Sequence, residues 1–98
     1  MREVLVSGQV WDKISELELF LQEEWKYSKE AARRRSDKMR VFLKSLSAPV
    51  DYALCRFNKW RLLGYRCAVF EKNWVFAYEI IEDSVIVRDM SNAALLIE

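Results

Sequence analysis

The last third of the chain contains three apolar-rich runs separated by very short connectors. The runs cover residues 65–70, 74–81 and 84–90, so the connectors are only 71–73 and 82–83. Connectors of this length join antiparallel neighbours and are too short for the crossover that parallel strands require. The sequence therefore predicts a three-stranded antiparallel meander.

The middle run alternates large side chains with mostly smaller ones. A period of two residues is typical of a strand with one strongly buried face, so residues 74–81 are predicted to be the central strand. The large members of this alternation are Trp74, Phe76, Tyr78 and Ile80.

Before the meander, the pattern predicts a short strand and two helices. Residues 2–6 have a β-branched centre that is typical of a strand, and Ser7 is a suitable N-cap for a helix over about 9–26. Ser28 is the predicted cap of a second helix, which Pro49 ends. The short break between the two helices predicts an antiparallel hairpin. The first helix has its apolar stripe at Val10, Ile14, Leu17, Leu21 and Trp25.

Residues 50–63 fit neither period, and we interpret them as a helical turn followed by an extended segment that leads to Gly64. The whole chain, 1–98, is then one two-layer α+β domain with the order β-α-α-β-β-β. The lone first strand must join the later sheet, because an unpaired strand is unstable. The helix hairpin would cover one face of the sheet and leave the other face and the edges to a partner.

Composition limits the classes of function. No uninterrupted apolar run reaches the ~18 residues of a membrane span, and the amino terminus does not resemble a secretory signal, so cytoplasmic residence is expected. Cys55 and Cys67 are the two cysteines and the chain has no histidine. We expect two buried, reduced thiols, with no metal and no cofactor. An enzyme built from this chain would work without the commonest general base.

Charge is segregated although the net charge is only +1. Residues 12–24 are acidic, 29–44 are basic, and 56–66 contain four cations and no acid: Arg56, Lys59, Arg61 and Arg66. Guanidinium groups hold phosphate oxygens in pairs, and the interleaved aromatic side chains of Phe57, Trp60 and Tyr65 are able to stack on bases. We expect Trp60 to be exposed for that purpose.

A structural interpretation of the same residues stays open. The cluster is equally compatible with an exposed basic face beside buried aromatic side chains, with Arg66 paired to Glu79. The arginines at 33–35 fan around a helix and are interpreted as a solvated face that answers the acidic first helix. We expect Trp74 to be buried, Tyr78 to be a core tyrosine with a satisfied hydroxyl, and Asp89 to lie in a turn.

The element order and the strand sequences 64–70, 77–80 and 85–88 resemble the RelE/ParE superfamily, the toxins of bacterial type II toxin–antitoxin modules. The resemblance covers nearly the whole chain in layout. It implies a growth-inhibiting protein that is neutralised in a hetero-oligomer with a cognate antitoxin. The target would be either mRNA, cleaved on the ribosome without a metal, or DNA gyrase, which such toxins inhibit.

Carried onto this chain, the RNA-cutting pattern implies Lys59, Arg61, Arg66 and Arg88 as catalytic residues. Arg56, Trp60 and Tyr65 would contact the RNA or another target. After Arg88 the chain has no Arg, Lys, Tyr or His, whereas the RNA-cutting branch expects late charge and a late aromatic base. The branch therefore stays open between mRNA cleavage and gyrase inhibition.

Two other functions remain compatible with the residues. One is a non-enzymatic nucleic-acid-binding module with its footprint on residues 33–40 or 56–66. The other is a protein-interaction domain that adds a partner's strand to its sheet edge.

Overall fold

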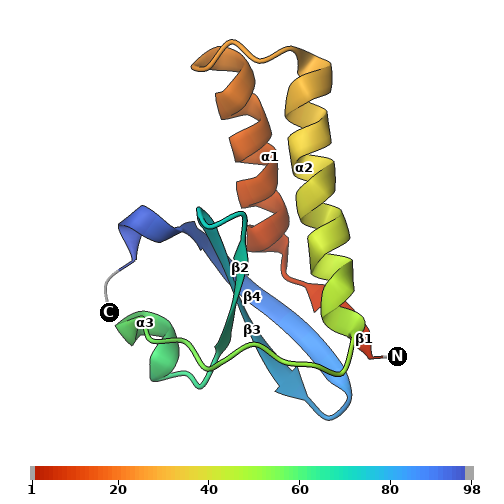
Figure 1. The fold of residues 1–98 in the computed structure, drawn as a ribbon, viewed down its shortest axis with the longest axis vertical. Helices are drawn as coiled ribbons and strands as arrows, with labels where there is room; N and C mark the ends of the chain where they lie inside the picture. The colour runs from red at the N-terminus through yellow and green to blue at the C-terminus, as the bar shows by residue number, and fades with distance from the viewer. Residues whose placement is uncertain (1, 97–98) are drawn as a thin grey trace.

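The computed structural model describes residues 2–96 and confirms the predicted α+β class and the β-α-α-β-β-β order (Figure 1). A short helix and two 3-10 turns supplement that order. The elements are β1 Glu3–Val6, α1 Gly8–Glu23, α2 Lys29–Lys44, η1 Ser45–Ser47, α3 Asn58–Arg61, β2 Arg66–Phe70, β3 Trp74–Ile81, β4 Ser84–Asn92 and η2 Ala93–Leu95.

The sheet has the strand order β1-β4-β3-β2. Strands β2, β3 and β4 form the predicted antiparallel meander, and β1 joins it parallel to β4, with Val4 opposite Val85. β3 is an interior strand as predicted, and β4 is a second one. Residues 85–87, the apolar run of β4, lie where this strand is paired on both sides, with β1 and with β3.

The hairpin of α1 and α2 lies on one face of the sheet and extends beyond it at the top of Figure 1. Ile14 from α1 and Met39 from α2 are buried against Phe76 and Tyr78 of β3 and Val87 of β4. α1 ends at Glu23, three residues before the predicted end, because the chain reverses through Lys26, whose φ is 57°. Ser28 caps α2 as predicted, since its side chain accepts a hydrogen bond from the Ala31 amide.

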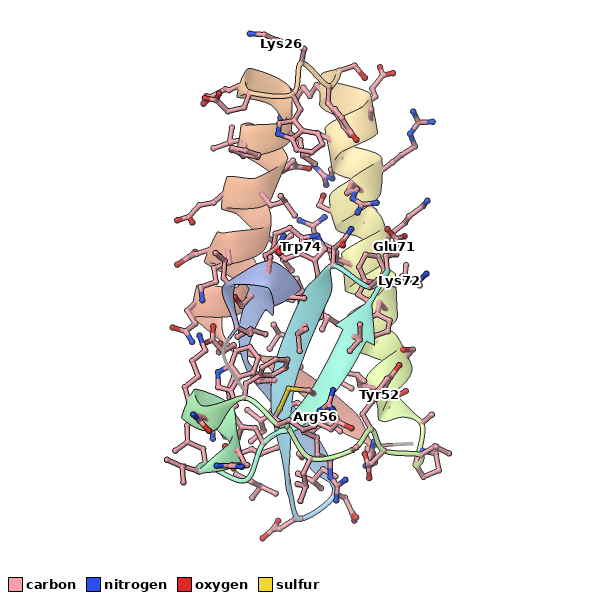
Figure 2. The ribbon with its side chains drawn as sticks, turned by 60° about the vertical axis from the view of Figure 1, so that its left-hand side comes forward. Lys26, Tyr52, Arg56, Glu71, Lys72 and Trp74 are labelled. Carbon is pink, nitrogen blue, oxygen red and sulfur yellow. A yellow bond between two sulfur atoms is a disulfide. The ribbon has the colours of Figure 1, made fainter. Side chains whose placement is uncertain are left out.

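Three arginines in the basic stretch of α2 form ion pairs within the chain. Arg33 and Arg40 both pair with Asp37, and Arg35 Nη1 lies 2.6 Å from Glu71 Oε2 in the β2–β3 turn. Glu71 and Lys72 in that turn, labelled in Figure 2, both have positive φ, so the Arg35 contact fastens a tight turn to the helix. A solvated helix face remains the best interpretation of these arginines. The acidic first helix contacts α2 through Glu18, whose carboxylate accepts a hydrogen bond from Ser36.

The second face of the sheet is not left free, which corrects the prediction. Residues 50–57 are extended and the helical turn α3 follows them, the reverse of the predicted order. α3 places Trp60 against Val75 and Ala77, where it is 2% exposed. The expected exposure of Trp60 is therefore wrong. A large apolar ring gains more from closing this second cluster than from facing water.

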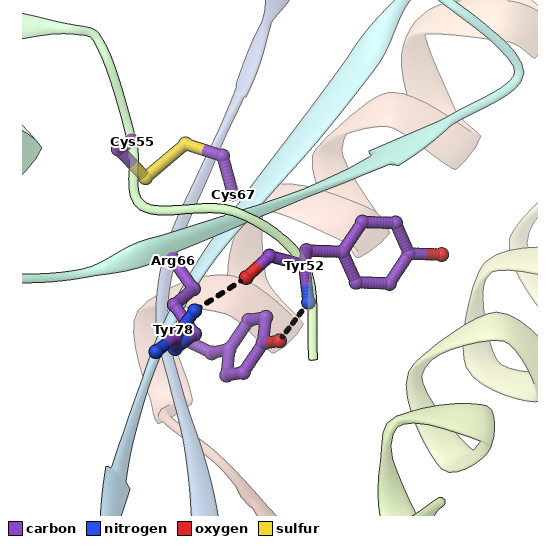
Figure 3. Close-up of a disulfide and its surroundings, with 5 residues drawn as sticks. All are labelled: Tyr52, Cys55, Arg66, Cys67 and Tyr78. Atoms are coloured by element: carbon purple, nitrogen blue, oxygen red, sulfur yellow. Dashed lines mark hydrogen bonds between the residues drawn. A yellow bond between two sulfur atoms is a disulfide. The ribbon is translucent and has the colours of Figure 1, made fainter. Parts of the chain in front are cut away.

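The cysteines form a disulfide, which overturns the expectation of two reduced thiols (Figure 3). Residues 53–55 run back beside β2, and this return brings the Cα atoms of Cys55 and Cys67 to 4.9 Å. A cross-link across a loop of this size stabilises the folded chain by about 3 kcal/mol in the chain-entropy estimate. Disulfides persist mainly in oxidising compartments, so cytoplasmic residence stays a prediction.

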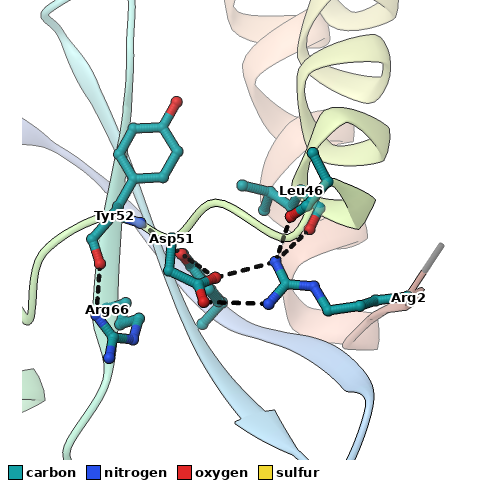
Figure 4. A network of polar contacts seen from close by, with 7 residues as sticks. Arg2, Leu46, Asp51, Tyr52 and Arg66 are labelled. Carbon is teal, nitrogen blue, oxygen red and sulfur yellow. Dashed lines mark hydrogen bonds and ion pairs between the residues drawn. The ribbon is translucent and has the colours of Figure 1, made fainter.

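A polar network holds the start of the same segment (Figure 4). Arg2 lies 2.9 Å from Asp51 and donates to the carbonyls of Leu46 and Ala48. The arginine lowers the pKa of Asp51 through this hydrogen bond and its charge, which outweigh the opposing effect of burial. The amino terminus, the end of α2 and the connector are thus joined at one point.

The Tyr78 hydroxyl connects this network to β3. It accepts a hydrogen bond from the Tyr52 amide at 2.9 Å and donates to Asp51 at 3.2 Å. Burial raises the pKa of Tyr78, so the phenol stays neutral. The expectation of a core tyrosine with a satisfied hydroxyl is confirmed. Trp74 is only partly buried.

We expect Tyr78→Phe to lower the free energy of unfolding by about 1–3 kcal/mol, because the Tyr52 amide and the Asp51 carboxylate each lose a partner. Equilibrium urea unfolding followed by circular dichroism measures this loss. Tyr27→Phe, at an exposed tyrosine of the helix hairpin, is the matched control and should change stability by a few tenths of a kcal/mol. Equal stability of Tyr78→Phe and wild type would show that the hydroxyl does not fasten the connector.

Candidate functional site

A hollow of about 590 Å³ lies between α3, β4 and the junction of β1 with α1. Four of the residues that the sequence singled out line it: Lys59, Trp60, Tyr65 and Arg88. They come from two segments more than twenty positions apart, which the packing of α3 on the sheet brings together. The remaining lining residues are Ser7, Gln9, Leu63 and Asp89.

A β-bulge in β4 shapes the floor of the hollow. Ala77 of β3 pairs with Asp89 and the next residue, Tyr78, pairs with Val87, so Arg88 is the extra residue. Bulges redirect side chains and interrupt the ladder. The freed carbonyl of Arg88 accepts hydrogen bonds from Ser7 Oγ at 3.1 Å and Gln9 Nε2 at 2.7 Å. The start of α1 thereby closes the edge of β4 beyond the end of β1.

Asp89 is a fixed carboxylate at this edge. It lies in β4 and not in a turn as predicted, and its Oδ1 is 2.6 Å from Lys13 Nζ. Burial alone would raise the pKa of Asp89. Hydrogen bonds from Lys13 and the Met90 amide, with the charges of Lys13 and Lys59, outweigh burial and hold that pKa below its ordinary value.

Arg88 is oriented by Glu79, the neighbouring acid on β3. The Arg88 Nε lies 2.5 Å from Glu79 Oε2, and the arginine side chain is still 40% exposed. Glu79 therefore pairs with Arg88, and the alternative pairing with Arg66 is wrong. The ion pair fixes one side of the guanidinium, and the exposed part keeps donors for a ligand.

The α3 wall carries the second cation of the hollow. Lys59 is exposed, and its Nζ lies 4.8 Å from the centroid of the Trp60 ring. Phe57 packs edge-on against the same ring at 6.1 Å and helps to fix it. Tyr65 is half-buried at the end of this wall. Lys59 and Arg88 thus face one hollow from two different elements.

The other predicted cations do not line this hollow. Arg66 Nη1 donates to the Tyr52 carbonyl at 2.7 Å and serves the connector. Arg61 Nη2 donates to Asn58 Oδ1 within α3 at 3.2 Å. Arg56 is exposed on the connector (Figure 2). Of the four predicted catalytic residues, only Lys59 and Arg88 are therefore brought together at the hollow.

This arrangement is suited to binding an anion and poorly suited to moving a proton. Two cations reach the hollow, and Tyr65 offers a ring beside them. Asp89, the acid that lines the hollow, has a lowered pKa and is engaged by Lys13. A general base works best with a pKa near the operating pH, and this carboxylate is far from that condition.

The sequence did not indicate Ser7, Gln9 or Lys13 as site residues, and for Asp89 a role in a turn was preferred to one in positioning a substrate. Each owes its place to contacts across 76–81 positions of sequence, such as Ser7 with Arg88 and Lys13 with Asp89. One signal was available, because Ser7 was predicted to stand where the first strand meets the first helix. Its side chain makes no capping hydrogen bond to α1 and is used on β4 instead.

A second, mostly apolar groove of about 620 Å³ lies between α1, the helix hairpin turn and the end of the meander. Phe20, Trp25 and Leu95 line it and are 46%, 63% and 77% exposed. Single exposed apolar side chains are ordinary, whereas a group of them along one groove is typical of an interaction surface. It contains none of the predicted site residues.

Comparison with known proteins identifies no relative: no family model, curated protein or solved structure matches this chain. Across residues 2–96, no helix is long and apolar enough to cross a membrane. Within the same part of the chain, no three acidic or cysteine side chains are grouped as metal ligands.

The Lys13–Asp89 pair should make stability pH-dependent. Because the folded pKa of Asp89 is lowered, its stabilisation is complete above the ordinary value of 3.8 and disappears as pH falls through the folded pKa. Asp89→Asn should cost about 1 kcal/mol or less at pH 7, since Lys13 is half-exposed. Urea unfolding between pH 2 and 7 should show this difference shrinking below about pH 4. Asp37→Asn, at an exposed ion pair within α2, is the control. A stability difference between Asp89→Asn and wild type that stays constant with pH would contradict the pairing of Asp89 with Lys13.

Proposed function

We propose that this chain is a growth-inhibiting toxin of the RelE/ParE type, held inactive by a cognate antitoxin. The observation that carries the proposal is the convergence of Lys59, Tyr65 and Arg88 on one hollow of a β-α-α-β-β-β domain. The residues that the sequence predicts to act on the target lie in two places far apart in the chain, the segment 56–66 and Arg88. The hollow contains residues from both. The proposal rests on this geometry together with the resemblance in layout.

The division between two surfaces supports the same proposal. The cationic hollow is suited to a negatively charged target, and the apolar groove on α1 is suited to the apolar side chains of a protein partner. An antitoxin segment in that groove would cover Phe20 and Trp25, whose exposure is otherwise costly. Target and antitoxin would then use different parts of the molecule.

Between the two branches, we favour inhibition by binding over RNA cleavage. Cleavage would require Arg61 and Arg66 beside Lys59 and Arg88, yet Arg66 is used by the Tyr52 carbonyl and does not line the hollow. Asp89 is a poor proton acceptor for the reason given above. DNA gyrase is therefore the preferred target, and ribosome-dependent cleavage of mRNA is the alternative branch.

Induced expression without an antitoxin should arrest bacterial growth, and Lys59→Gln with Arg88→Gln should restore growth by removing both cations of the hollow. Colony counts after induction measure this. The matched control is Arg34→Gln with Lys72→Gln, which removes two exposed cations outside the hollow and should leave the arrest intact. Urea unfolding of all three proteins shows whether the variants are folded. Normal growth with the wild-type chain would refute the toxin proposal.

Two assays with purified protein separate the branches. A gyrase supercoiling assay should be inhibited, while translation in a cell extract should proceed with intact mRNA. The reverse result would identify the RNA-cutting branch. If the protein inhibits neither supercoiling nor translation and the bacteria grow normally, both the gyrase branch and the mRNA-cleavage branch are refuted.

A nucleic-acid-binding module without enzymatic activity is the second candidate, and one observation favours it. The hollow combines two cations with the ring of Tyr65, and its acid, Asp89, is poorly suited to act as a general base. Phosphate contacts make affinity fall steeply with added salt. Binding to an oligonucleotide that is steeply weakened by salt, without growth arrest, would support this candidate.

A further inference from the structure

The connector between α2 and α3 is attached to the sheet by a covalent bond and by a small set of hydrogen bonds at each of its ends. Cys55 on the connector is bonded to Cys67 on β2. Figure 3 shows this bond beside the side chains of Tyr52, Arg66 and Tyr78. The polar network around Tyr78 holds the beginning of the connector, and the disulfide holds its end.

Without the disulfide, the end of the connector would be held beside β2 by two backbone hydrogen bonds, together with the packing of Cys55 and Phe57 in the second apolar cluster. The Cys55 amide donates to the Tyr65 carbonyl at 2.8 Å, and the Cys67 amide donates to the Ala53 carbonyl at 3.2 Å. Ala53 and Leu54 are exposed, so little apolar burial supports these bonds. Segments of this kind open locally at low free-energy cost.

The disulfide packs behind the α3 wall of the cationic hollow. Cys55 is 2% exposed and packs in the second cluster with Trp60, Val75 and Ala77. Trp60 and its neighbours Lys59 and Tyr65 line the hollow. A connector released at residue 55 would leave α3 attached to the sheet through the packing of Trp60, Phe57 and Tyr65 in this cluster.

We propose that the Cys55–Cys67 disulfide is a redox latch that holds the α3 wall, so that reduction loosens the hollow and weakens its hold on an anionic target. The latch regulates the site assigned above, and its effect on target binding rests on the proposed function. The effect on the connector does not rest on it. A disulfide that links a functional wall to a sheet is a suitable point of control in a small domain.

The reductant is a dithiol. One thiolate attacks the sulfur of Cys67, the less buried cysteine, forms a mixed disulfide and breaks the Cys55–Cys67 bond. Cys55 leaves as a thiolate and takes a proton from solvent. The second thiol of the reductant then attacks the mixed disulfide and releases Cys67. The protein gains two thiols, and the dithiol is oxidised to its own disulfide.

The first measurement is amide hydrogen exchange of the full chain, oxidised or reduced with dithiothreitol. The amides of Cys55 and Cys67 report the two backbone bonds directly, and their exchange should become at least about tenfold faster after reduction. Amides of the interior strands β3 and β4 should change far less. Cys55→Ala with Cys67→Ala should exchange rapidly in both conditions and should not respond to the dithiol. Unchanged exchange at residues 55 and 67 after complete reduction would overturn the latch.

The second measurement is binding of a fluorescent single-stranded oligonucleotide of mixed sequence, as an anionic probe, by both forms. The oxidised form should bind more tightly, and reoxidation should recover the difference. If the oxidised and reduced proteins bind the oligonucleotide with equal, measurable affinity, the proposal that the disulfide controls binding at the hollow is overturned. Absence of binding to either form, together with accelerated exchange on reduction, would count against the hollow as an anion site and would support the latch as a conformational device.

Discussion

The attachment of residues 50–57 to the sheet is the constraint on which the rest of this structure depends. One tyrosine hydroxyl, on the interior strand β3, accepts from the Tyr52 amide and donates to Asp51, which in turn holds Arg2. Arg66 donates to the Tyr52 carbonyl from β2. Four distant parts of the chain are therefore fixed at one end of an otherwise irregular segment. The course of that segment decides where α3 lies.

Once the connector is fixed, α3 is able to close a second apolar cluster on the sheet. Helix hairpins commonly leave the opposite face of such a sheet to solvent, and here Trp60 covers Val75 and Ala77 instead. Strand β3 is consequently buried on both faces between Val75 and Tyr78. Burying a large aromatic side chain contributes about 1.5–3 kcal/mol. This burial explains how a chain with so little regular structure between α2 and β2 holds those residues in place.

The sequence predicted the elements whose pattern is local. The period of two in residues 74–81, the helical stripe from Val10 to Leu21 and the cap at Ser28 each express contacts within a few positions. The Cys55–Cys67 disulfide and the packing of Trp60 on Val75 depend on a chain reversal through residues 50–63, whose pattern fits neither a helix nor a strand. The same reason divides the candidate site. Lys59 and Arg88 were found by charge and resemblance, whereas Lys13 and Asp89 meet across 76 positions and have no local signature.

The charges around the hollow argue for recognition by a small number of strong contacts. Arg88 and Lys13 are each paired with an acid, so the net attraction for a distant anion is weak and long-range steering contributes little. At contact the balance differs, because an arginine whose Nε is already held presents its remaining donors in a fixed plane. A ligand then pays less entropy to order that side chain. A near-neutral domain of this kind selects its partner by the fit of a few groups within one wall, and the position of that wall is set by the connector.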